Sequence, residues 1–352
     1  MPAPRVLVLF NQPVLPPDHP DRGAEEDVLY SVKIVRESLK AVGIPSDEFG
    51  VTSDLPALLA RLQQPDFDVV FNLYEGDADN SVTEVYLTGL LEWLGVAYTG
   101  CPSFTLAVAR QKAVAKRLFA AAGILTPEFV MLDAGDPVPE NPVGFPAVVK
   151  PASEDASIGI DQGSVVTTPA ELAARVRYVF DQYGPPALVE RFIAGREIQV
   201  SLIDLTNTGN PTMLPLSEIA FDPASGHWPV YTYTAKWDET SDEYKAAPVR
   251  VGAAVPPPVL AALEDVTKRV YRLLGARDYA RVDTRVTAAG QVYVLELNPN
   301  PAITSVMIDE GLPTVGGTYD KFIAALVTNA ASRRPGPTGN RRTRMPTPTP
   351  NP

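Results

Sequence analysis

Cysteine and histidine are almost absent from this chain of 352 residues. Cys101 is the single cysteine, so neither an intrachain disulfide nor a CxxC metal knuckle can form. The two histidines, His19 and His227, are too few for a histidine-based zinc site or for the confident assignment of a Ser-His triad. The sequence therefore argues against zinc hydrolases and against hydrolases of the triad type.

Long apolar runs and an excess of basic charge are also missing. The apolar run VLVLF at residues 6–10 is too short for a signal peptide or a membrane-spanning helix. The net charge of −12 argues against nucleic acid or an anionic membrane as a main partner. We therefore expect a soluble, cytoplasmic protein that binds no nucleic acid and no membrane.

The N-terminal part of the chain alternates strand patterns with helix patterns. We expect a strand over 5–10, a helix over 23–44, a strand over 67–76, and a helix followed by a short strand over 83–100. This alternation predicts a parallel sheet covered by helices. Residues 1–103 are accordingly interpreted as one open-sheet α/β domain, in a chain long enough for two or three domains.

The remainder of the chain gives a longer series of predicted elements. They are, in order, a helix over 106–124, strands over 128–132 and 145–152, a helix over 168–184 that begins with a capping box, two strands over 186–205 around a turn at Gly195, a helix over 256–276, and a hairpin over 279–298 with its turn at Gly290. A polar and aromatic stretch over 222–248 has little periodicity, which is typical of a functional or mobile loop. The Pro/Thr/Arg-rich segment 331–352 is expected to be disordered.

Oxygen-bearing side chains gather on the predicted C-terminal hairpin. Glu296 and Asn298 are two residues apart on one strand and therefore share a face, and pairing across Gly290 would bring Asp283 alongside them. Three hard oxygen ligands suit Mg²⁺, whereas the alternative is a solvated polar face on an edge hairpin. Arg281 shares the face of Asp283, where it is either an ion-pair partner of the carboxylates or an anion clamp for a substrate.

Three lysines are candidates for binding phosphate. Lys150 ends an apolar strand in FPAVVKPASEDASIGI and precedes a small, polar, glycine-containing loop, an arrangement that suits a nucleotide. The Walker pattern is absent, so an ordinary lysine at a strand end remains the alternative. Taken alone, Lys112 reads as a helix surface lysine and Lys236 as an ordinary loop lysine.

Two glutamates flank the predicted turn in LVERFIAGREIQV. The backbone beside Glu190, at a strand end, is placed to meet an adenine edge, and Glu197 is placed to accept a hydrogen bond from a ribose hydroxyl. The alternative is that Glu190 and Glu197 are ordinary carboxylates on the protein surface.

In this order and spacing, the segments resemble the ATP-grasp superfamily and, within it, the D-alanine–D-alanine ligases. The resemblance extends from about residue 5 to about residue 310. It rests on six segments: LEWLGVAYTGC, QKAVAKRLFAAAGILTP, FPAVVKPASEDASIGI, LVERFIAGREIQVSLI, YTYTAKW and ARVDTRVTAAGQVYVLELNPNPAITS. It implies an α/β fold of three domains, with ATP clamped between the central and C-terminal parts.

The implied domains are an N-terminal open-sheet domain over 1–103, a central lid-like subdomain over 104–184, and a C-terminal domain with an antiparallel sheet over 185–330. Residues 222–248 would form a mobile loop within the last of these. The implied reaction is the phosphorylation of a carboxylate by ATP, followed by attack of an amine on the acyl phosphate. The resemblance also implies small-molecule substrates, amino acids above all, Mg²⁺ or alternatively Mn²⁺, and a homodimer.

The resemblance assigns roles to individual residues, all carried over by position. The nucleotide would be held by Lys112, Lys150 and Lys236 at its phosphates, by Ser157 in the phosphate loop, by Glu190 at the adenine hinge and by Glu197 on the ribose. Asp283, Glu296 and Asn298 would hold one or two Mg²⁺, and Arg281 would steady the acyl phosphate. The amine of the first substrate would be held by Glu26 or by Asp27, between which the sequence does not decide.

The chain departs from the family where the amino-acid substrates would bind. Ala156 and Trp237 stand where the family has a serine and a tyrosine, and Ala302 and Met307 replace a glycine and a serine. The glycine-rich turn after the first strand is replaced by Asn-Gln-Pro at 11–13. We expect an ATP-dependent carboxylate–amine ligase of altered amino-acid specificity; the alternatives are a genuine D-alanine–D-alanine ligase and a nucleotide-binding protein without ligase turnover.

Overall fold

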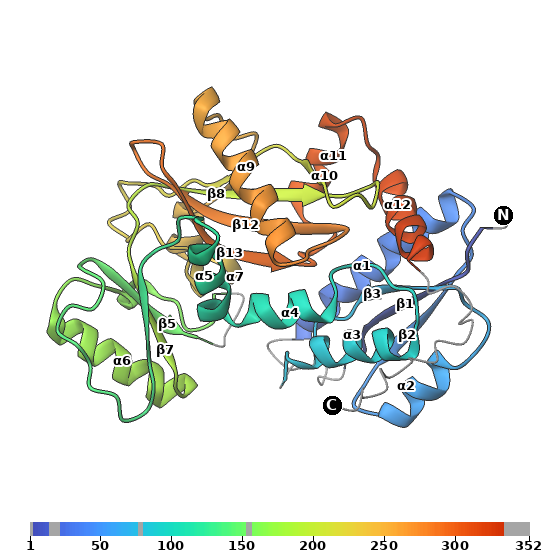
Figure 1. The fold of residues 1–352 in the computed structure, drawn as a ribbon, viewed down its shortest axis with the longest axis horizontal. Helices are drawn as coiled ribbons and strands as arrows, with labels where there is room; N and C mark the ends of the chain where they lie inside the picture. Colours follow the sequence, from blue (N-terminus) through green and yellow to red (C-terminus); the bar gives the residue numbers. More distant parts are fainter. Residues whose placement is uncertain (1–2, 14–21, 77–79, 153–156, 334–352) are drawn as a thin grey trace, which may run out of the picture.

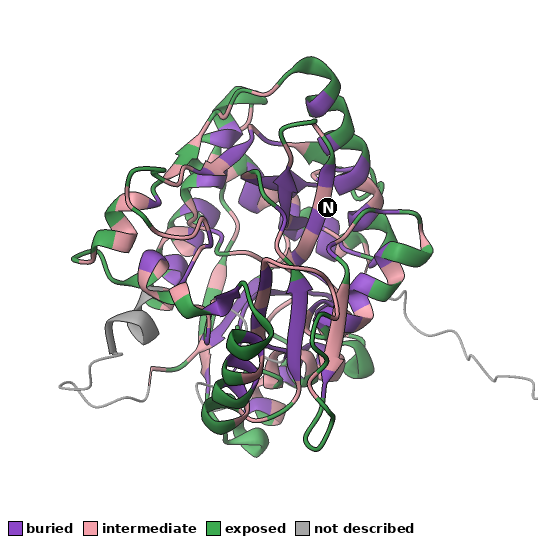
Figure 2. Ribbon diagram, turned by 90° about the vertical axis from the view of Figure 1, so that its left-hand side faces the viewer, coloured by how far each residue is buried: buried purple, intermediate pink, exposed green. Residues whose placement is uncertain are grey.

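Three β-sheets form the framework of the protein in the computed structural model (Figure 1). The structure describes residues 3–13, 22–76, 80–152 and 157–333, and the side chains of residues 22–27 lie outside the described part. One sheet is parallel and three-stranded, and the other two are antiparallel, with four and six strands. Buried residues follow the strands, whereas the outer helix faces are exposed (Figure 2).

The N-terminal sheet is the predicted parallel layer. Its elements are β1 (Val6–Asn11), α1 (Arg22–Ala41), β2 (Ser46–Val51), α2 (Leu55–Leu62), β3 (Val69–Leu73) and α3 (Thr83–Leu94). β1 lies between β2 and β3 and pairs in parallel with both, and its apolar residues are buried, as expected for a central parallel strand.

The sequence patterns gave an incomplete account of this sheet. β2 and α2 were not predicted, since SDEFGV is a partly exposed edge strand without a regular apolar alternation. The short strand expected after α3 is reduced to a single bridge between Val70 and Tyr98.

The helix predicted over 106–124 is two helices. α4 (Ser103–Arg110) and α5 (Lys112–Ala121) meet at Gln111, whose φ of −85° and ψ of 76° are not helical. The Ala-rich sequence contains neither glycine nor proline at this point, so no residue signals the break. The break places Lys112 at the first turn of α5, where its side chain is buried.

The four-stranded sheet consists of β4 (Phe129–Leu132), β5 (Ala147–Pro151), β6 (Val165–Val166) and β7 (Ala187–Arg191), in the order β4-β7-β5-β6. It is covered by α6 (Pro169–Tyr183), which Thr168 caps by accepting a hydrogen bond from the Glu171 N–H. β7 falls on the C-terminal side of the domain boundary predicted at 184, yet it pairs with β4 and β5. We therefore propose the three-domain division with this boundary moved beyond Arg191.

The six-stranded sheet carries most of the C-terminal part. Its strands are β8 (Arg196–Ile203), β9 (Thr212–Met213), β10 (Ser217–Ile219), β11 (Val249–Val251), β12 (Tyr279–Val286) and β13 (Val292–Pro299). The predicted hairpin is confirmed, because β12 and β13 pair across a turn at Gly290, where φ is +79°. The two strands expected around Gly195 also form, but they belong to different sheets.

The stretch 222–248 contains two helices that were not predicted. They are α7 (Tyr233–Trp237) and α8 (Asp242–Ala246). Thr232 and Ser241 cap them by accepting hydrogen bonds from backbone N–H groups three residues on. A helix of five residues shows too little apolar periodicity to be recognised in a sequence.

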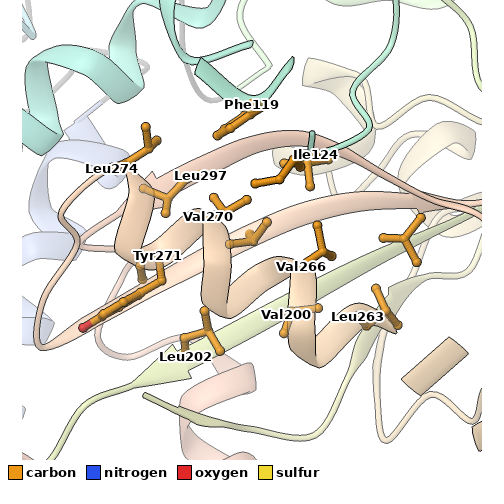
Figure 3. Close-up of a cluster of buried hydrophobic side chains, with 14 of the residues drawn as sticks. Phe119, Ile124, Val200, Leu202, Leu263, Val266, Val270, Tyr271, Leu274 and Leu297 are labelled. Atoms are coloured by element: carbon orange, nitrogen blue, oxygen red, sulfur yellow. The ribbon is translucent and has the colours of Figure 1, made fainter. Parts of the chain in front are cut away.

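The largest core lies under α9 (Pro257–Leu273), the helix predicted over 256–276. Apolar residues at helical spacing, including Leu263, Val266 and Val270, point from α9 toward β8, β12 and β13 (Figure 3). Phe119 and Ile124, which follow the break at Gln111, pack into the same cluster. This packing fixes α5 against the hairpin and so fixes the place of Lys112.

The C-terminal helices join the N-terminal sheet to the rest of the protein. α10 (Val306–Asp309), α11 (Gly311–Thr314) and α12 (Tyr319–Ser332) follow the hairpin, and α12 packs against α1 and β3. Phe322, Leu326 and Val327 share one buried cluster with β1 and β3. The core therefore crosses the domain boundary predicted at 103.

A buried ion pair fixes the end of α12. The Asp278 carboxylate accepts hydrogen bonds from two nitrogens of Arg333 and from the Gly100 N–H, all at 2.7 Å, and the Asp278 side chain is fully buried. The prediction of disorder is therefore wrong for residues 331–333, because α12 runs to Ser332 and Arg333 is paired; the rest of that segment lies outside the described residues.

Replacing Arg333 by alanine should lower the free energy of unfolding by about 3 kcal/mol, because Asp278 would remain buried without its counter-charge. The measurement is the midpoint of urea-induced unfolding. Lys268→Ala is the control, since its i,i+4 pair with Glu264 is partly exposed and should contribute about 0.3–0.5 kcal/mol. Equal effects of the two substitutions would show that Asp278 does not depend on Arg333.

Candidate functional site

An open cleft lies between the four-stranded sheet and the hairpin of β12 and β13. Its empty volume, including the open solvent at its mouth, is about 1250 Å³. Its walls come from β5, β7, β8, α5, α7, β12 and β13, several of which gather at the centre of Figure 1. The lining includes ten of the predicted site residues: Lys112, Lys150, Ser157, Glu190, Glu197, Lys236, Arg281, Asp283, Glu296 and Asn298. The side chains of Glu26 and Asp27 lie outside the described part of the structure.

The register of the hairpin brings the predicted metal ligands together. Asp283 is the cross-strand partner of Glu296, and Arg281 is the partner of Asn298. Arg281 donates to both oxygens of Asp283, with Nε to Oδ1 at 2.7 Å and Nη2 to Oδ2 at 2.9 Å. Asn298 Nδ2 donates to Asp283 Oδ2 at 3.0 Å. Of the two readings of Arg281, the ion-pair partner is thus the one seen in the structure.

The carboxylate of Glu296 is surrounded by positive charge. Lys112 Nζ lies 3.6 Å from Glu296 Oε2. Burial alone would raise the pKa of Glu296, but Lys112, Lys150 and Arg281 outweigh burial and lower the pKa to about 2. Glu296 is therefore ionised at neutral pH, and with its cross-strand partner Asp283 it supplies carboxylate oxygens of the type that Mg²⁺ prefers.

A second buried charge cluster contains a residue that the sequence did not single out. Glu190 lies between two lysines, with Lys116 Nζ 3.2 Å from its Oε1 and Lys150 Nζ 3.2 Å from its Oε2. Lys116 is almost fully buried and also donates to Thr126 Oγ1 at 3.0 Å. Its position four residues after Lys112, on the same face of α5, is the signal that could have identified it.

Burial and the neighbouring charges shift the pKa values of this cluster in opposite directions. Burial would raise the pKa of Glu190, but the nearby Lys116 and Lys150 hold it below its ordinary value. Burial lowers the pKa of Lys116, and Glu190 only partly opposes this shift. The Glu190 carboxylate is therefore the counter-ion of the two lysines. The backbone beside Glu190 is the part that we expect to meet the adenine edge.

Glu197 has a partner that sequence reasoning also missed. Arg285 Nη2 lies 2.8 Å from Glu197 Oε2, and both side chains are buried on the floor of the cleft. Burial raises the pKa of Glu197, while Arg285 opposes that shift. Glu197 and Arg285 are 88 positions apart in the chain, so no local pattern joins them.

Lys236 reaches the cleft from the short helix α7. Its Nζ lies 4.9 Å from the centre of the Trp237 ring, a cation–π contact. Burial lowers the pKa of Lys236, and the nearby Arg281 lowers it further, while Asp283 and Glu296 oppose the shift. Lys236 thus faces the hairpin carboxylates from the other side of the cleft.

The loop after β5 and the segment after β13 complete the lining. Ser157 has a φ of +66° and lines the cleft, whereas Ala156 lies outside the described residues. Met307 is buried and lines the cleft, while Ala302 is exposed. Asn300, in the turn after β13, accepts a hydrogen bond from the Cys101 N–H at 2.7 Å and so ties the hairpin to the N-terminal part.

Comparison with known proteins gives consistent results. Residues 118–328 match the family model for the D-ala D-ala ligase C-terminus. The D-alanine–D-alanine ligase of Geobacter sulfurreducens is 34% identical over 313 residues, which cover 87% of this chain and 90% of that protein. The ligase of the same name from Synechococcus sp. is 30% identical over 335 residues, which cover 92% of this chain and 97% of that protein.

A solved structure shows the same fold at lower identity. The D-alanine–D-alanine ligase of Bacillus anthracis complexed with ATP superposes with a TM-score of 0.70 at 20% identity, covering 94% of this chain and 99% of that chain. This likeness confirms the expected α/β ATP-grasp fold. None of the helices within the described ranges combines the length and apolar character needed to cross a bilayer.

The protein is therefore an ATP-grasp ligase, a class of enzyme that forms C–N bonds. It belongs to the D-alanine–D-alanine ligase family, as the match of the family model over more than half of the chain and the two relatives indicate.

Replacing Glu190 by glutamine should lower the free energy of unfolding at pH 7 by about 3–5 kcal/mol, because Lys116 would be buried without a counter-charge. The pKa of Glu190 is lower in the folded protein than in the unfolded chain, so its contribution is present above the unfolded pKa and is lost as the pH falls through the folded value.

Urea unfolding of both proteins at several pH values tests this. The difference between wild type and Glu190→Gln should be complete at pH 7 and should shrink below about pH 4. A difference that stays constant down to acid pH would show that Glu190 is not held as a carboxylate by its lysines.

Proposed function

We propose that the protein joins a small carboxylic acid to an amine at the expense of ATP, through an acyl phosphate. The observation that carries this proposal is the convergence of three lysines, two carboxylates and an amide on one cleft. The lysines are Lys112, Lys150 and Lys236, and the oxygen ligands are those of the hairpin. Such a collection of cations beside a hard-oxygen site suits a triphosphate with its metal ion.

The proposed reaction has two steps. In the first, an oxygen of the substrate carboxylate forms a bond to the γ-phosphorus of ATP, the bond from that phosphorus to the bridging oxygen breaks, and ADP leaves. In the second, the amine nitrogen forms a bond to the acyl carbon, the bond to the phosphate oxygen breaks, and phosphate leaves while the nitrogen loses a proton. The products are an amide, ADP and phosphate.

The protein's contribution to the first step is charge neutralisation and positioning. Lys112, Lys150 and Lys236, which line the cleft, are proposed to neutralise the phosphates, and Lys150 is paired with Glu190. Arg281 is fixed by Asp283 and faces the same part of the cleft, where it is proposed to steady the transferred phosphoryl group. Ser157 is proposed to lie in the polar loop that covers the phosphates.

We propose that Asp283, Glu296 and Asn298 hold Mg²⁺, with Mn²⁺ as an alternative. Glu296 is ionised, and its cross-strand partner Asp283 offers a second carboxylate at the same level of the hairpin. When bound, the metal ion would neutralise phosphate charge. The adenine is proposed to meet the backbone beside Glu190, and the ribose to meet Glu197.

The acceptor end of the cleft supports an amino-acid specificity that differs from that of the relatives. Met307 offers a buried thioether, which is at best a weak hydrogen-bond acceptor and donates nothing. Trp237 places a large ring beside Lys236, although Trp237 itself is half exposed and does not line the cleft. We therefore propose an acceptor that is bulkier or less polar than D-alanine, with the amine of the first substrate held by Glu26 or Asp27.

Two broader properties are proposed from the resemblance. We expect a homodimer, which light scattering of the purified protein measures directly. We also expect a cytoplasmic location.

Glu296→Gln should reduce the rate of ADP release at least 100-fold, because the cleft loses one carboxylate of the proposed metal site. The measurement is ADP formation with Mg-ATP and a panel of D- and L-amino acids, amines and hydroxy acids, with mass spectrometry of the product. Glu264→Gln, on α9 outside the cleft, is the control and should keep the wild-type rate. Unchanged turnover of Glu296→Gln would contradict the metal assignment, and ATP binding without turnover in wild type would favour a nucleotide-binding protein.

Met307→Ser should raise kcat/KM for D-alanine as acceptor about 10-fold relative to amines that lack a carboxylate, because a hydroxyl would donate a hydrogen bond to the carboxylate of the amino acid. Met213→Ser, on β9 outside the cleft lining, should leave the ratio unchanged. Wild-type protein that makes D-alanyl-D-alanine as its preferred product would contradict the proposed change of specificity.

A further inference from the structure

Arg285 is a buried cation on the floor of the cleft. It lies on the central part of the six-stranded sheet, where β12 pairs with β8, and its cross-strand partner on β8 is Glu197. The side chain is only 4% exposed, and it lines the cleft together with Arg281 and Asp283 of the same strand. An arginine so deeply buried requires several acceptors to offset its desolvation.

The guanidinium contacts three separate parts of the cleft wall. Besides Glu197, it donates to the Gly195 carbonyl at 3.1 Å and to the Pro229 carbonyl. Gly195 lies in the turn between the two antiparallel sheets, and Pro229 lies four residues before the first residue of α7. Arg285 therefore links β8, this turn and the segment that leads to Lys236.

Two aromatic rings hold the guanidinium in this orientation. Its central carbon lies 5.6 Å from the centre of the Phe192 ring and 5.5 Å from that of Phe221. Phe192 also lines the cleft and directly follows β7. Planar contacts and a forked set of donors are properties of arginine that lysine lacks, so the site is specific for arginine.

The carboxylate of Glu197 depends on this arrangement. A buried carboxylate without a counter-charge is strongly disfavoured. An ionised carboxylate only accepts hydrogen bonds, which suits a sugar that presents two adjacent hydroxyl donors. Glu197 is the cleft-lining carboxylate proposed for that sugar, and the ion pair fixes the direction in which its oxygens point.

We propose that Arg285 is a positioning residue for the nucleotide sugar. It holds the Glu197 carboxylate ready to accept hydrogen bonds from the two ribose hydroxyls. The proposal rests on the proposed function, which places the nucleotide in this cleft. It concerns a residue that acts through Glu197 and does not itself touch the reacting atoms.

Binding of ADP in the presence of MgCl₂, without any amino acid, separates this proposal from the question of turnover. Titration calorimetry would compare ADP with 2′,3′-dideoxy-ADP for wild type and for Arg285→Met. The affinity for ADP should fall about 10- to 100-fold, the range expected for hydrogen bonds to a charged group. The affinity for the dideoxy nucleotide should change less than about threefold, since it has no hydroxyls for Glu197.

Arg196→Met is the matched control. Arg196 lies on the same strand as Glu197, and it donates to both oxygens of Glu218 at 2.7 Å outside the cleft lining. Its replacement should leave both affinities unchanged. Arg285→Lys keeps the charge but cannot reach all three acceptors, so its loss should be smaller, about 3- to 10-fold, and again confined to ADP.

The outcomes show whether the role of Arg285 fails alone or fails together with the proposed function. An equal loss for both nucleotides, or no loss for either, would show a merely structural Arg285 and overturn this proposal while leaving the proposed function intact. Wild-type protein that binds neither nucleotide would overturn the proposed function and this proposal together. If Arg285→Met fails to fold, the same comparison with Arg285→Lys decides the question.

Discussion

The pairing register of β12 is the constraint on which the candidate site depends. This strand has β13 on one side and β8 on the other, so Asp283 faces Glu296 across one edge and Arg285 faces Glu197 across the other. A slip of one residue would turn every one of these side chains to the opposite face of the sheet. The core under α9 prevents such a slip, because the alternate residues of β12 are packed against that helix.

The charges in the cleft are stable only as a group. Lys116 would be costly to bury alone, and so would Glu190, yet each is the counter-ion of the other and Lys150 is shared between Glu190 and the cleft. The same holds for Arg281 with Asp283. Fixed charges of this kind need no reorganisation when a polyphosphate enters, which is how a preorganised site lowers the barrier to phosphoryl transfer.

Features that depend on local pattern could be predicted from the sequence, and features that depend on distant pairing could not. Alternation on both sides of Gly290 was enough to predict the hairpin and the shared face of Glu296 and Asn298. The pair of Glu197 with Arg285 arises from the contact of β8 with β12, which no short window contains. The break at Gln111 was missed for another reason: helix-forming residues run through it, and packing under α9 decides the outcome.

The two ends of the cleft are built on different physical principles. The proposed nucleotide end is lined by charges whose partners are fixed by strand pairing, so a single substitution there leaves an unpaired buried charge. The proposed acceptor end is lined by Met307, whose flexible thioether adapts to many shapes and needs no partner. We therefore expect a substitution of Met307 to disturb the fold less than a substitution among the paired buried charges. This difference would allow the proposed amino-acid end of the cleft to change while the proposed nucleotide end stays intact.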